Sequence, residues 1–456
     1  MTGVVVFCAL CALLFVGKIV RVNVPFLQRL YLPSSVVGGL VGLVLVSCLG
    51  DRIPAEYTAA ARKVPGFLIN VIFATLFLGA VTPKVRDVFR HAFPQLCVGQ
   101  LIAWGQYVVG LGLAGFVFAT CFGVPPAFGN LLEMGFEGGH GTVGGMVESF
   151  KAFHWEDGVA LGFTMATAGM VLGIVLGMAM IQWAYRKGHV RQVVAFEHRA
   201  DFERRGILPP DQRPAAGRQT VMCDSIDSLA WHLAVVGISI LVGYGLLRGF
   251  QSAEVALFPE AKTRVFKGFP LFPLCMVGGV LLQALAHRLK RSLLVDRGQM
   301  ERISGAALDF LVVAAVATIQ LKVVAANWQP LAILVLAGAA WSTWVVLFVA
   351  PRVFKDAWFE RAIAEFGQAT GVTATGLMLL RTVDPENRTP AAMSFGYKQL
   401  LHEPFMGGGI WTACAFVLVY RIGWLNVWYI SLAMLALWGV TSCWVARGRA
   451  KTPGCP

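Results

Sequence analysis

The sequence predicts an all-α polytopic membrane protein with two inverted-topology repeats of five transmembrane helices. Each repeat is expected to carry one glycine-rich re-entrant hairpin, and one extra C-terminal helix follows. Of 456 residues, 57% are hydrophobic and 14% are charged, against roughly 25% charged in an ordinary soluble chain. The apolar residues form blocks of about twenty, the length that crosses the hydrocarbon of a bilayer. Because barrel strands would show short alternating segments, we expect these blocks to be helices.

The first repeat is predicted at 1–185. Its apolar blocks predict spans at 3–17, 33–50, 65–82, 94–119 and 158–183. A glycine-rich segment at about 125–150 lies between the fourth and fifth spans and is too polar for a plain transmembrane helix. We read it as a hairpin that enters the membrane and turns back.

The second repeat, 225–421, follows a basic linker at 186–224. Its spans are predicted at 229–247, 269–286, 303–321 and 330–349 and within 390–420, with a hairpin at about 362–381. The last segment, 422–456, is expected to form an extra transmembrane helix at 424–445 and a basic tail. The linker and the tail hold these basic residues: Arg186, Lys187, Arg191, Arg199, Arg204, Arg205, Arg213, Arg218, Arg447, Arg449 and Lys451.

The placement of Lys and Arg predicts the orientation. Cytoplasmic loops carry an excess of these residues, so the basic linker and the basic loops at 18–29, 84–91, 287–297 and 352–361 are placed in the cytoplasm. The N-terminus then lies outside a cell inner (plasma) membrane and the C-terminus lies inside. The two halves start on opposite sides, as in secondary transporters that bind solutes at the repeat interface.

Several function classes are disfavoured by the same pattern. The formal net charge is +13, but the basic residues sit in short loops between apolar blocks, which argues against nucleic-acid binding. The sequence has no Gly-x-Ser-x-Gly elbow, paired metal-binding histidines or Walker lysine, which argues against an enzyme. No cofactor is expected. A passive channel is the less favoured alternative, because no repeated carbonyl filter is present.

The two glycine-rich segments are where we expect the solute to bind. The first runs through Glu133, Glu137 and Gly138 to Gly145, and the second runs from Gly367 to Gly376. Glycine permits positive φ and close approach of the backbone to a ligand. Free N–H groups can then hold a carboxylate, while carbonyls and Thr hydroxyls coordinate a small cation. The alternative is that these glycines only allow tight helix packing.

These motifs resemble those of the sodium/glutamate symporter family. The resemblance rests on three stretches and covers nearly the whole chain apart from the last helix: Gly138-Gly139-His140-Gly141-Thr142, then Gly367 with Gly371, Thr373 and Thr375, and Pro33 with Val36, Val37, Gly38 and Gly39. It implies sodium-coupled uptake of glutamate or a similar amino acid or carboxylate, with Na⁺ as coupling ion. It also implies a homodimer in which a mobile domain carries both hairpins by elevator-type alternating access.

The same resemblance implies that substrate and sodium lie between the hairpin tips. The substrate-binding residues would be Gly138, Gly139, His140, Gly141, Thr142, Gly371, Thr373 and Thr375. Ala374 stands where the family has a proline, and Glu133 and Glu137 replace small polar residues. Proton-coupled transport of another small carboxylate or amino acid is therefore kept as the alternative.

Other intramembrane polar residues are candidates by their position. Asn70 and Asp309 lie in corresponding spans, and with Glu137 and Thr370 they are predicted to couple the cation. Asp309 alternatively pairs with Arg302 near the cytoplasmic end, and Glu137 with Lys151 at the outer rim. Arg381 is predicted to hold a substrate carboxylate or, alternatively, to be a cytoplasmic topology charge.

Overall fold

The computed structural model describes residues 1–30, 32–80, 85–190, 200–257, 259, 266, 269–385 and 388–448, apart from the side chains of residue 51 and of 85–91. All the regular secondary structure in this part of the chain is helical, and it has no strand. The predictions that rest on Lys84, Arg191, Arg199, Arg449 and Lys451 lie outside the described residues.

Six described helical segments are long and apolar enough to cross a membrane, so the protein is an integral membrane protein. They are Thr2–Asn23, Ala92–Cys121, Asp157–Arg186, Ser228–Leu257, Trp328–Val353 and Trp424–Arg447. Three shorter apolar helices cover Ser34–Leu49, Phe272–Arg288 and Ile410–Arg421. The spans predicted at 65–82 and 303–321 overlap in part with helices α4 (Ala55–Thr75) and α14 (Arg297–Ala317), which carry charged residues and are not among the six. Residues 81–82 of the first of these spans lie outside the described residues.

The chain divides into two compact units, each built from both halves of the sequence. Unit 1 comprises Met1–Thr82, His140–Val159 and Ala200–Gln320, and unit 2 comprises Pro83–Gly139, Ala160–Arg199 and Leu321–Pro456. The two units are defined by which residues pack together, whereas the predicted ranges 1–185 and 225–421 are defined by the repeat along the sequence. Because the units do not test the repeat, these ranges stay predictions.

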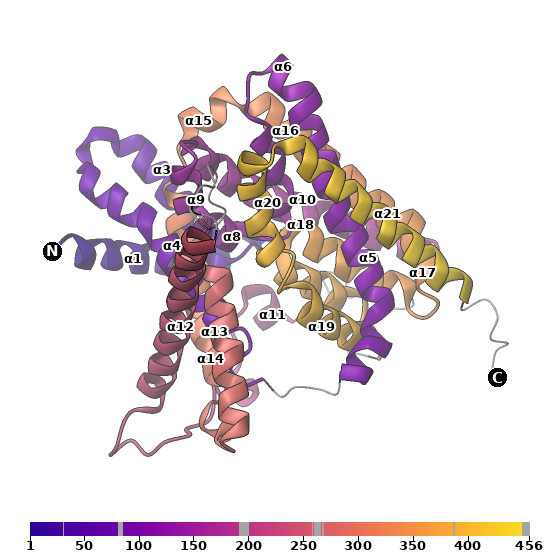
Figure 1. Cartoon of the computed structure of the whole chain (residues 1–456). Helices are drawn as coiled ribbons and strands as arrows, with labels where there is room; N and C mark the ends of the chain where they lie inside the picture. Colours follow the sequence, from indigo (N-terminus) through magenta and orange to yellow (C-terminus); the bar gives the residue numbers. More distant parts are fainter. Residues whose placement is uncertain are drawn as a thin grey trace. The chain divides into compact units, whose positions relative to one another are not determined.

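Unit 1 contains these helices: α1 (Thr2–Asn23), α2 (Pro25–Arg29), α3 (Ser34–Leu49), η1 (Gly50–Arg52), α4 (Ala55–Thr75), α8 (Gly139–Gly145, of which Gly139 belongs to unit 2), α9 (Val147–Ala152), α11 (Asp201–Arg205), η5 (Pro210–Gln212), α12 (Ser228–Leu257), α13 (Phe272–Arg288), η6 (Ser292–Leu294) and α14 (Arg297–Ala317). Helices α12, α13 and α14 lie together in Figure 1. Helix α14 packs on α3 and α4, α1 packs on α3, and α13 packs on α4 and α12.

Polar contacts fix the start of α14. Asp296 caps this helix by accepting hydrogen bonds from the backbone N–H groups of Gln299 and Arg218, each at 3.0 Å. The Arg297 guanidinium donates to the Leu76 carbonyl at 2.7 Å, which satisfies an orphan acceptor at the end of α4. These hydrogen bonds connect the N-terminus of α14 to the end of α4 and to the linker.

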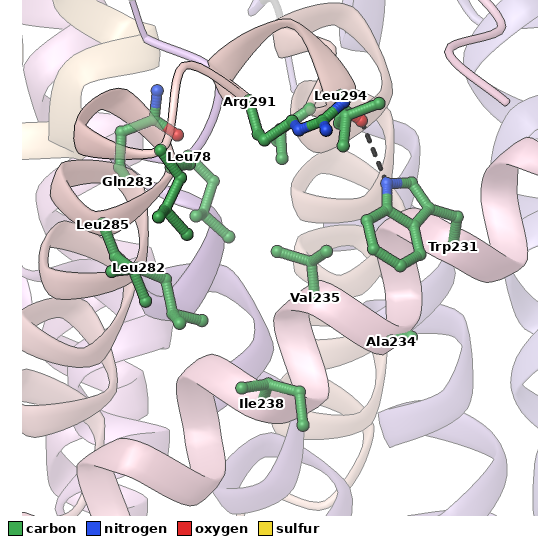
Figure 2. Close-up of a pocket in the computed structure, with 13 residues that line it drawn as sticks. Leu78, Trp231, Ala234, Val235, Ile238, Leu282, Gln283, Leu285, Arg291 and Leu294 are labelled. Atoms are coloured by element: carbon green, nitrogen blue, oxygen red, sulfur yellow. Dashed lines mark hydrogen bonds between the residues drawn. The ribbon is translucent and has the colours of Figure 1, made fainter.

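An apolar cavity of about 310 Å³ opens between α12 and α13 (Figure 2). The Trp231 indole N–H donates to the Leu294 carbonyl at 3.0 Å beside this cavity. Gln283 and Arg291 are its polar lining residues, and none of the predicted site residues lines it.

Unit 2 contains these helices: α5 (Val85–Gly112), the π-helical η2 (Leu113–Phe118), α6 (Ala119–Cys121), η3 (Pro126–Asn130), α7 (Leu131–Phe136), α10 (Asp157–Arg186, from Ala160 onward), α15 (Leu321–Ala326), α16 (Trp328–Trp344), the π-helical η7 (Val345–Val349), α17 (Ala350–Val353), α18 (Trp358–Val383), α19 (Ala391–His402), α20 (Ile410–Arg421) and α21 (Trp424–Gly448). Helix α5 is central, because it packs against α7, α16, α18, α19 and α21.

Helix α18 is broken at its glycine-rich centre. Gly371 (φ −148°, ψ 33°) and Val372 (φ 63°, ψ 172°) leave the helical region, and the two arms, 358–370 and 373–383, fold back on each other. A Cβ added at Gly367 would lie 2.6 Å from the Cα of Gly376, nine residues later. In a continuous helix these positions would be about 13 Å apart. The two glycines therefore allow the arms to touch.

The last span predicted before the C-terminal helix is also interrupted. Helices α19 and α20 are separated by the non-helical segment 403–409, which contains Pro404 and three consecutive glycines, Gly407 to Gly409. Gly407 (φ 65°) and Gly408 (φ 107°) adopt backbone conformations that favour glycine. The prediction of one span within 390–420 missed this break, although its residues were visible in the sequence.

Candidate functional site

The glycine-rich tip of the first segment contacts the break in α18. Gly139 has φ 66°, and a Cβ added there would lie 2.5 Å from Cγ1 of Val372. Val372 itself has φ 63°, a genuine outlier for a β-branched residue. Such outliers persist only where the surrounding structure enforces them, and they cluster at functional sites. Within unit 2 the two non-helical turns therefore meet directly.

Unit 2 also contains a fully buried ion pair. The Lys398 ammonium on α19 is 2.9 Å from Oε2 of Glu365 on α18, and neither side chain is exposed. Lys398 also donates to Oε1 of Gln368 at 3.2 Å. Gln95 on α5 donates to Oε1 of Glu365 at 2.9 Å. Three helices thus contribute to one buried polar cluster.

Glu137 belongs to a second buried pair. Its Oε2 is 3.1 Å from Nε2 of His402, and both side chains are fully buried. Nδ1 of His402 is 3.2 Å from the amide nitrogen of Gln100. The Oε1 atom of Gln100 accepts from the indole N–H of Trp104 at 2.8 Å. The chain of contacts therefore runs from the first tip through α19 to α5.

Glu133, one helical turn before Glu137, is held by three donors. Tyr107 donates its hydroxyl to Oε2 at 2.6 Å. Oε1 accepts from the hydroxyl of Thr412 at 2.9 Å and from the N–H of Gly407 at 2.8 Å. The break between α19 and α20 thus supplies one of the three groups that satisfy this buried carboxylate, and the first turn of α20 supplies a second.

The predicted substrate residue Thr373 begins the second arm of α18. Its hydroxyl donates to Oε1 of Glu403 at 2.6 Å and accepts from the Gln399 amide at 2.6 Å. Gln399 also donates to the same Glu403 oxygen at 2.9 Å. All three residues lie on α18 or at the end of α19, so this small cluster joins the second tip to the interrupted span.

Other predicted residues of unit 2 lie at varying distances from the tips. Thr370 is buried and donates to the Phe366 carbonyl at 2.7 Å. Thr375 is buried, and its Oγ1 would be 2.8 Å from a Cβ at Gly371. Arg381 is exposed. It lies eight residues after Thr373, or about 12 Å along a helix, so the structure does not bring it to the tip.

The remaining predicted residues lie in unit 1. His140, Gly141 and Thr142 follow the tip along the chain, and Gly141 packs near Ile69 of α4. Asn70 of α4 donates to the Gly66 carbonyl at 2.8 Å.

Two ion pairs were left open as alternatives from the sequence, Asp309 with Arg302 and Glu137 with Lys151, and the structure gives the partners of three of these residues. Asp309 of α14 accepts a hydrogen bond from Ser35 of α3. Lys151, the partner considered for Glu137, is 3.0 Å from Glu148, whereas Glu137 faces His402. The predicted roles of Asn70, Asp309 and Glu137 remain predictions.

Several residues of the buried clusters were missed from the sequence. Lys398 and His402 are four residues apart on α19, and Gln100, Trp104 and Tyr107 share one face of α5. On a helix such spacing places side chains on the same face. The sequence did contain a signal for these residues: polar residues recur every three or four positions within apolar segments.

The comparison with known protein families decides the family. The profile of the sodium/glutamate symporter family matches residues 2–383. This chain belongs to the sodium/glutamate symporter family. Membership implies sodium-coupled transport of a small molecule such as glutamate and makes the protein a transporter rather than an enzyme. None of the curated proteins compared with it matches the sequence.

The match to the symporter family ends at Val383, the last residue of α18. The matched segment includes Glu133, Glu137 and Glu365. Their partners Lys398, His402 and Thr412 lie on α19 and α20, beyond the matched residues. In this symporter, the buried polar clusters are thus completed by helices outside the matched segment.

Proposed function

We propose that this protein is a secondary active transporter that carries glutamate, or a similar amino acid or carboxylate, together with sodium by alternating access. The observation that carries the proposal is the contact between Gly139 and Val372. It joins two interrupted backbone segments of unit 2, both of which carry the motif residues of the symporter family. Non-helical backbone is tolerated at membrane depth only where protein or a water-filled cavity surrounds it.

The proposed substrate position lies at these tips. Gly138, Gly139, Gly371 and Thr373 offer backbone N–H groups and a hydroxyl to a carboxylate, and Thr370 and Thr375 offer oxygens to sodium. Glu137 would contribute to cation coupling. His140, Gly141 and Thr142 continue the first tip and are included on the family resemblance alone.

The architecture we propose has two inverted repeats, each of five transmembrane segments and one re-entrant hairpin. Two observations support it. α18 reverses direction at Gly371 and Val372, and the fourth span of each half ends in a π-helical segment, Leu113–Phe118 or Val345–Val349. The mechanism proposed is of the elevator type, in a homodimer in the cell inner membrane with the N-terminus outside.

Ligand-dependent thermal stabilisation tests the binding step. The full-length protein in detergent is heated with L-glutamate, L-aspartate or a small dicarboxylate, in sodium or in choline chloride. A ligand that binds only the folded state raises apparent stability, by about 2.7 kcal/mol at one hundred times its dissociation constant. We expect stabilisation by one of these anions in sodium only. No stabilisation by any of them in sodium would contradict the proposal.

A further inference from the structure

The buried clusters of unit 2 contain more acid than base. Glu133, Glu137 and Glu365 are at most 3% exposed, and Lys398 is fully buried. If all four groups were ionised, three negative charges would face one positive charge. An uncompensated charge in a low-dielectric interior is costly. The cluster therefore requires further positive charge, either a cation or a proton on one of the carboxylates.

Hydrogen bonding distinguishes the three carboxylates. Glu133 accepts from three donors, and Glu365 accepts from Gln95 and is paired with the Lys398 ammonium. Both arrangements suit an ionised carboxylate, which only accepts. Glu137 is contacted at Oε2 by His402 and interacts with the Gln368 side chain, but its Oε1 makes no hydrogen bond of normal geometry among the described residues. Glu137 is thus the carboxyl with room for a proton.

The tautomer of His402 is fixed from α5. The Trp104 indole only donates, so the Gln100 atom that it contacts must be the oxygen. The Gln100 amide nitrogen then faces Nδ1 of His402 at 3.2 Å. An N–H group at Nδ1 would oppose this donor, so Nδ1 is an acceptor. His402 is accordingly neutral, and its only N–H, at Nε2, is directed at Glu137.

We propose that Glu137 takes up one proton in each transport cycle, while His402 stays neutral and acts as a positioning residue. This inference rests on the proposed transport function and adds a coupling proton to sodium. The proton forms an O–H bond on the Glu137 carboxyl on one side of the membrane and leaves from it on the other. Neutral Glu137 lowers the repulsion of an anionic substrate at the neighbouring tip, so proton and substrate travel together.

Charged and titratable groups lie near Glu137 on several neighbouring elements. These are Tyr107 on α5, Glu133 on α7, Glu365 on α18, and Lys398, His402 and Glu403 on or next to α19. In the part of the chain that the structure describes, no three His, Cys, Asp or Glu residues are grouped as metal ligands. Glu133 and Glu365 instead have their own donors, whereas Oε1 of Glu137 makes no hydrogen bond of normal geometry among the described residues, so Glu137 is the carboxyl suited to a proton.

Infrared spectroscopy of the full-length protein in lipid tests the inference without any substrate. A protonated buried carboxyl has a distinct C=O band. We expect this band to disappear with rising pH in the wild type and to be absent in Glu137→Gln. Glu148→Gln, at an exposed carboxylate paired with Lys151, is the matched control and should keep the band. If the wild type and Glu137→Gln show the same titration, the inference is wrong.

A transport assay separates this inference from the proposed function. Vesicles loaded with a pH-sensitive dye take up labelled L-glutamate under a sodium gradient. We expect internal acidification with uptake, and an apparent affinity that rises up to about tenfold per unit fall in pH. Since glutamate keeps one net negative charge from about pH 5 to 8, this dependence belongs to the protein. Sodium-driven uptake without acidification would overturn the proton site and leave the proposed function standing.

Gln100→Glu tests the positioning role of His402. A carboxylate at this position accepts a hydrogen bond from an N–H group at Nδ1, so His402 can become an imidazolium and Glu137 can remain ionised. We expect the protonated-carboxyl band to shift to lower pH by about one unit or more. A variant that only loosened the packing would lower stability without moving this band. An unmoved band in folded Gln100→Glu would contradict the assigned role of His402.

Discussion

The Lys398 ammonium lies 2.9 Å from the Glu365 carboxylate, and both side chains are completely buried in unit 2. Removing one partner of such a pair leaves an uncompensated buried charge, which destabilises a protein by about 3–5 kcal/mol. We expect Lys398→Met and Glu365→Gln each to lower the thermal stability of the full-length protein in detergent. The double variant should regain most of the loss. A double variant less stable than both single variants would contradict this account.

The contact between Gly139 and Val372 gives a second prediction. Gly139→Ala places a Cβ 2.5 Å from Cγ1 of Val372 and adds strain of about 1–2 kcal/mol at a positive φ. We expect uptake to be lost. Adding Val372→Ala removes the clashing methyl group and should restore part of the activity.

Gly237→Ala is the control for this pair, since no atom lies within 4 Å of a Cβ at that position. It should leave uptake unchanged. If Gly139→Ala is fully active, or if Val372→Ala gives no recovery, the tips do not meet in the functional protein.

Thr373 provides a third prediction through its hydroxyl. Thr373→Val keeps the shape of the side chain but loses the contacts with Glu403 and Gln399. Because the cluster is only partly buried, we expect a loss of about 1 kcal/mol in stability and a clear fall in uptake. Thr373→Ser retains the hydroxyl and should remain close to the wild type. Equal behaviour of the two variants would show that the hydroxyl is not used.

Asp296, at the start of α14, predicts a pH dependence for unit 1. Burial alone would raise the pKa of this carboxyl. The hydrogen bonds from the backbone N–H groups of Arg218 and Gln299, together with the charges of His232 and Arg218, outweigh that effect and lower its pKa below 3.8. A depressed folded-state pKa stabilises the protein above the unfolded-state pKa of about 3.9, and this contribution is lost as the pH falls through the folded-state value.

Asp296→Asn isolates this charge, because Asn caps helices about as well as Asp. We expect the variant to be less stable than the wild type at pH 7 and the difference to shrink as the pH falls below about 4. Asp211→Asn, at an exposed carboxyl of the same unit, should show no such difference. A stability gap that grows on acidification would have the wrong sign and refute the assignment.

Much of the helical organisation followed from hydropathy. The apolar blocks at 3–17, 158–183 and 424–445 became the long helices α1, α10 and α21, since an apolar stretch in lipid must satisfy its own backbone. The breaks near Gly139 and Gly371 also followed from local sequence, because clustered glycines remove the steric bar to non-helical backbone.

The buried ion pairs could not be predicted in the same way. Glu365 and Lys398 lie on different helices, and no local pattern tells which carboxylate meets which ammonium. One span was predicted within 390–420 without an interruption in that segment, so the break that brings Gly407 to Glu133 was missed. Arg381 was predicted either to hold a substrate carboxylate or to be a cytoplasmic topology charge. It is exposed and lies about 12 Å along a helix from Thr373, and both roles stay predictions.

Uptake of labelled L-glutamate by vesicles containing the full-length protein tests the central claim most directly. With an inward sodium gradient we predict accumulation above the external concentration. Replacing sodium by choline should abolish that accumulation, and so should Gly139→Ala. Equal uptake with and without sodium, or none of glutamate, aspartate or a small dicarboxylate under any gradient, would contradict the claim that the meeting tips form a cation-coupled carboxylate site.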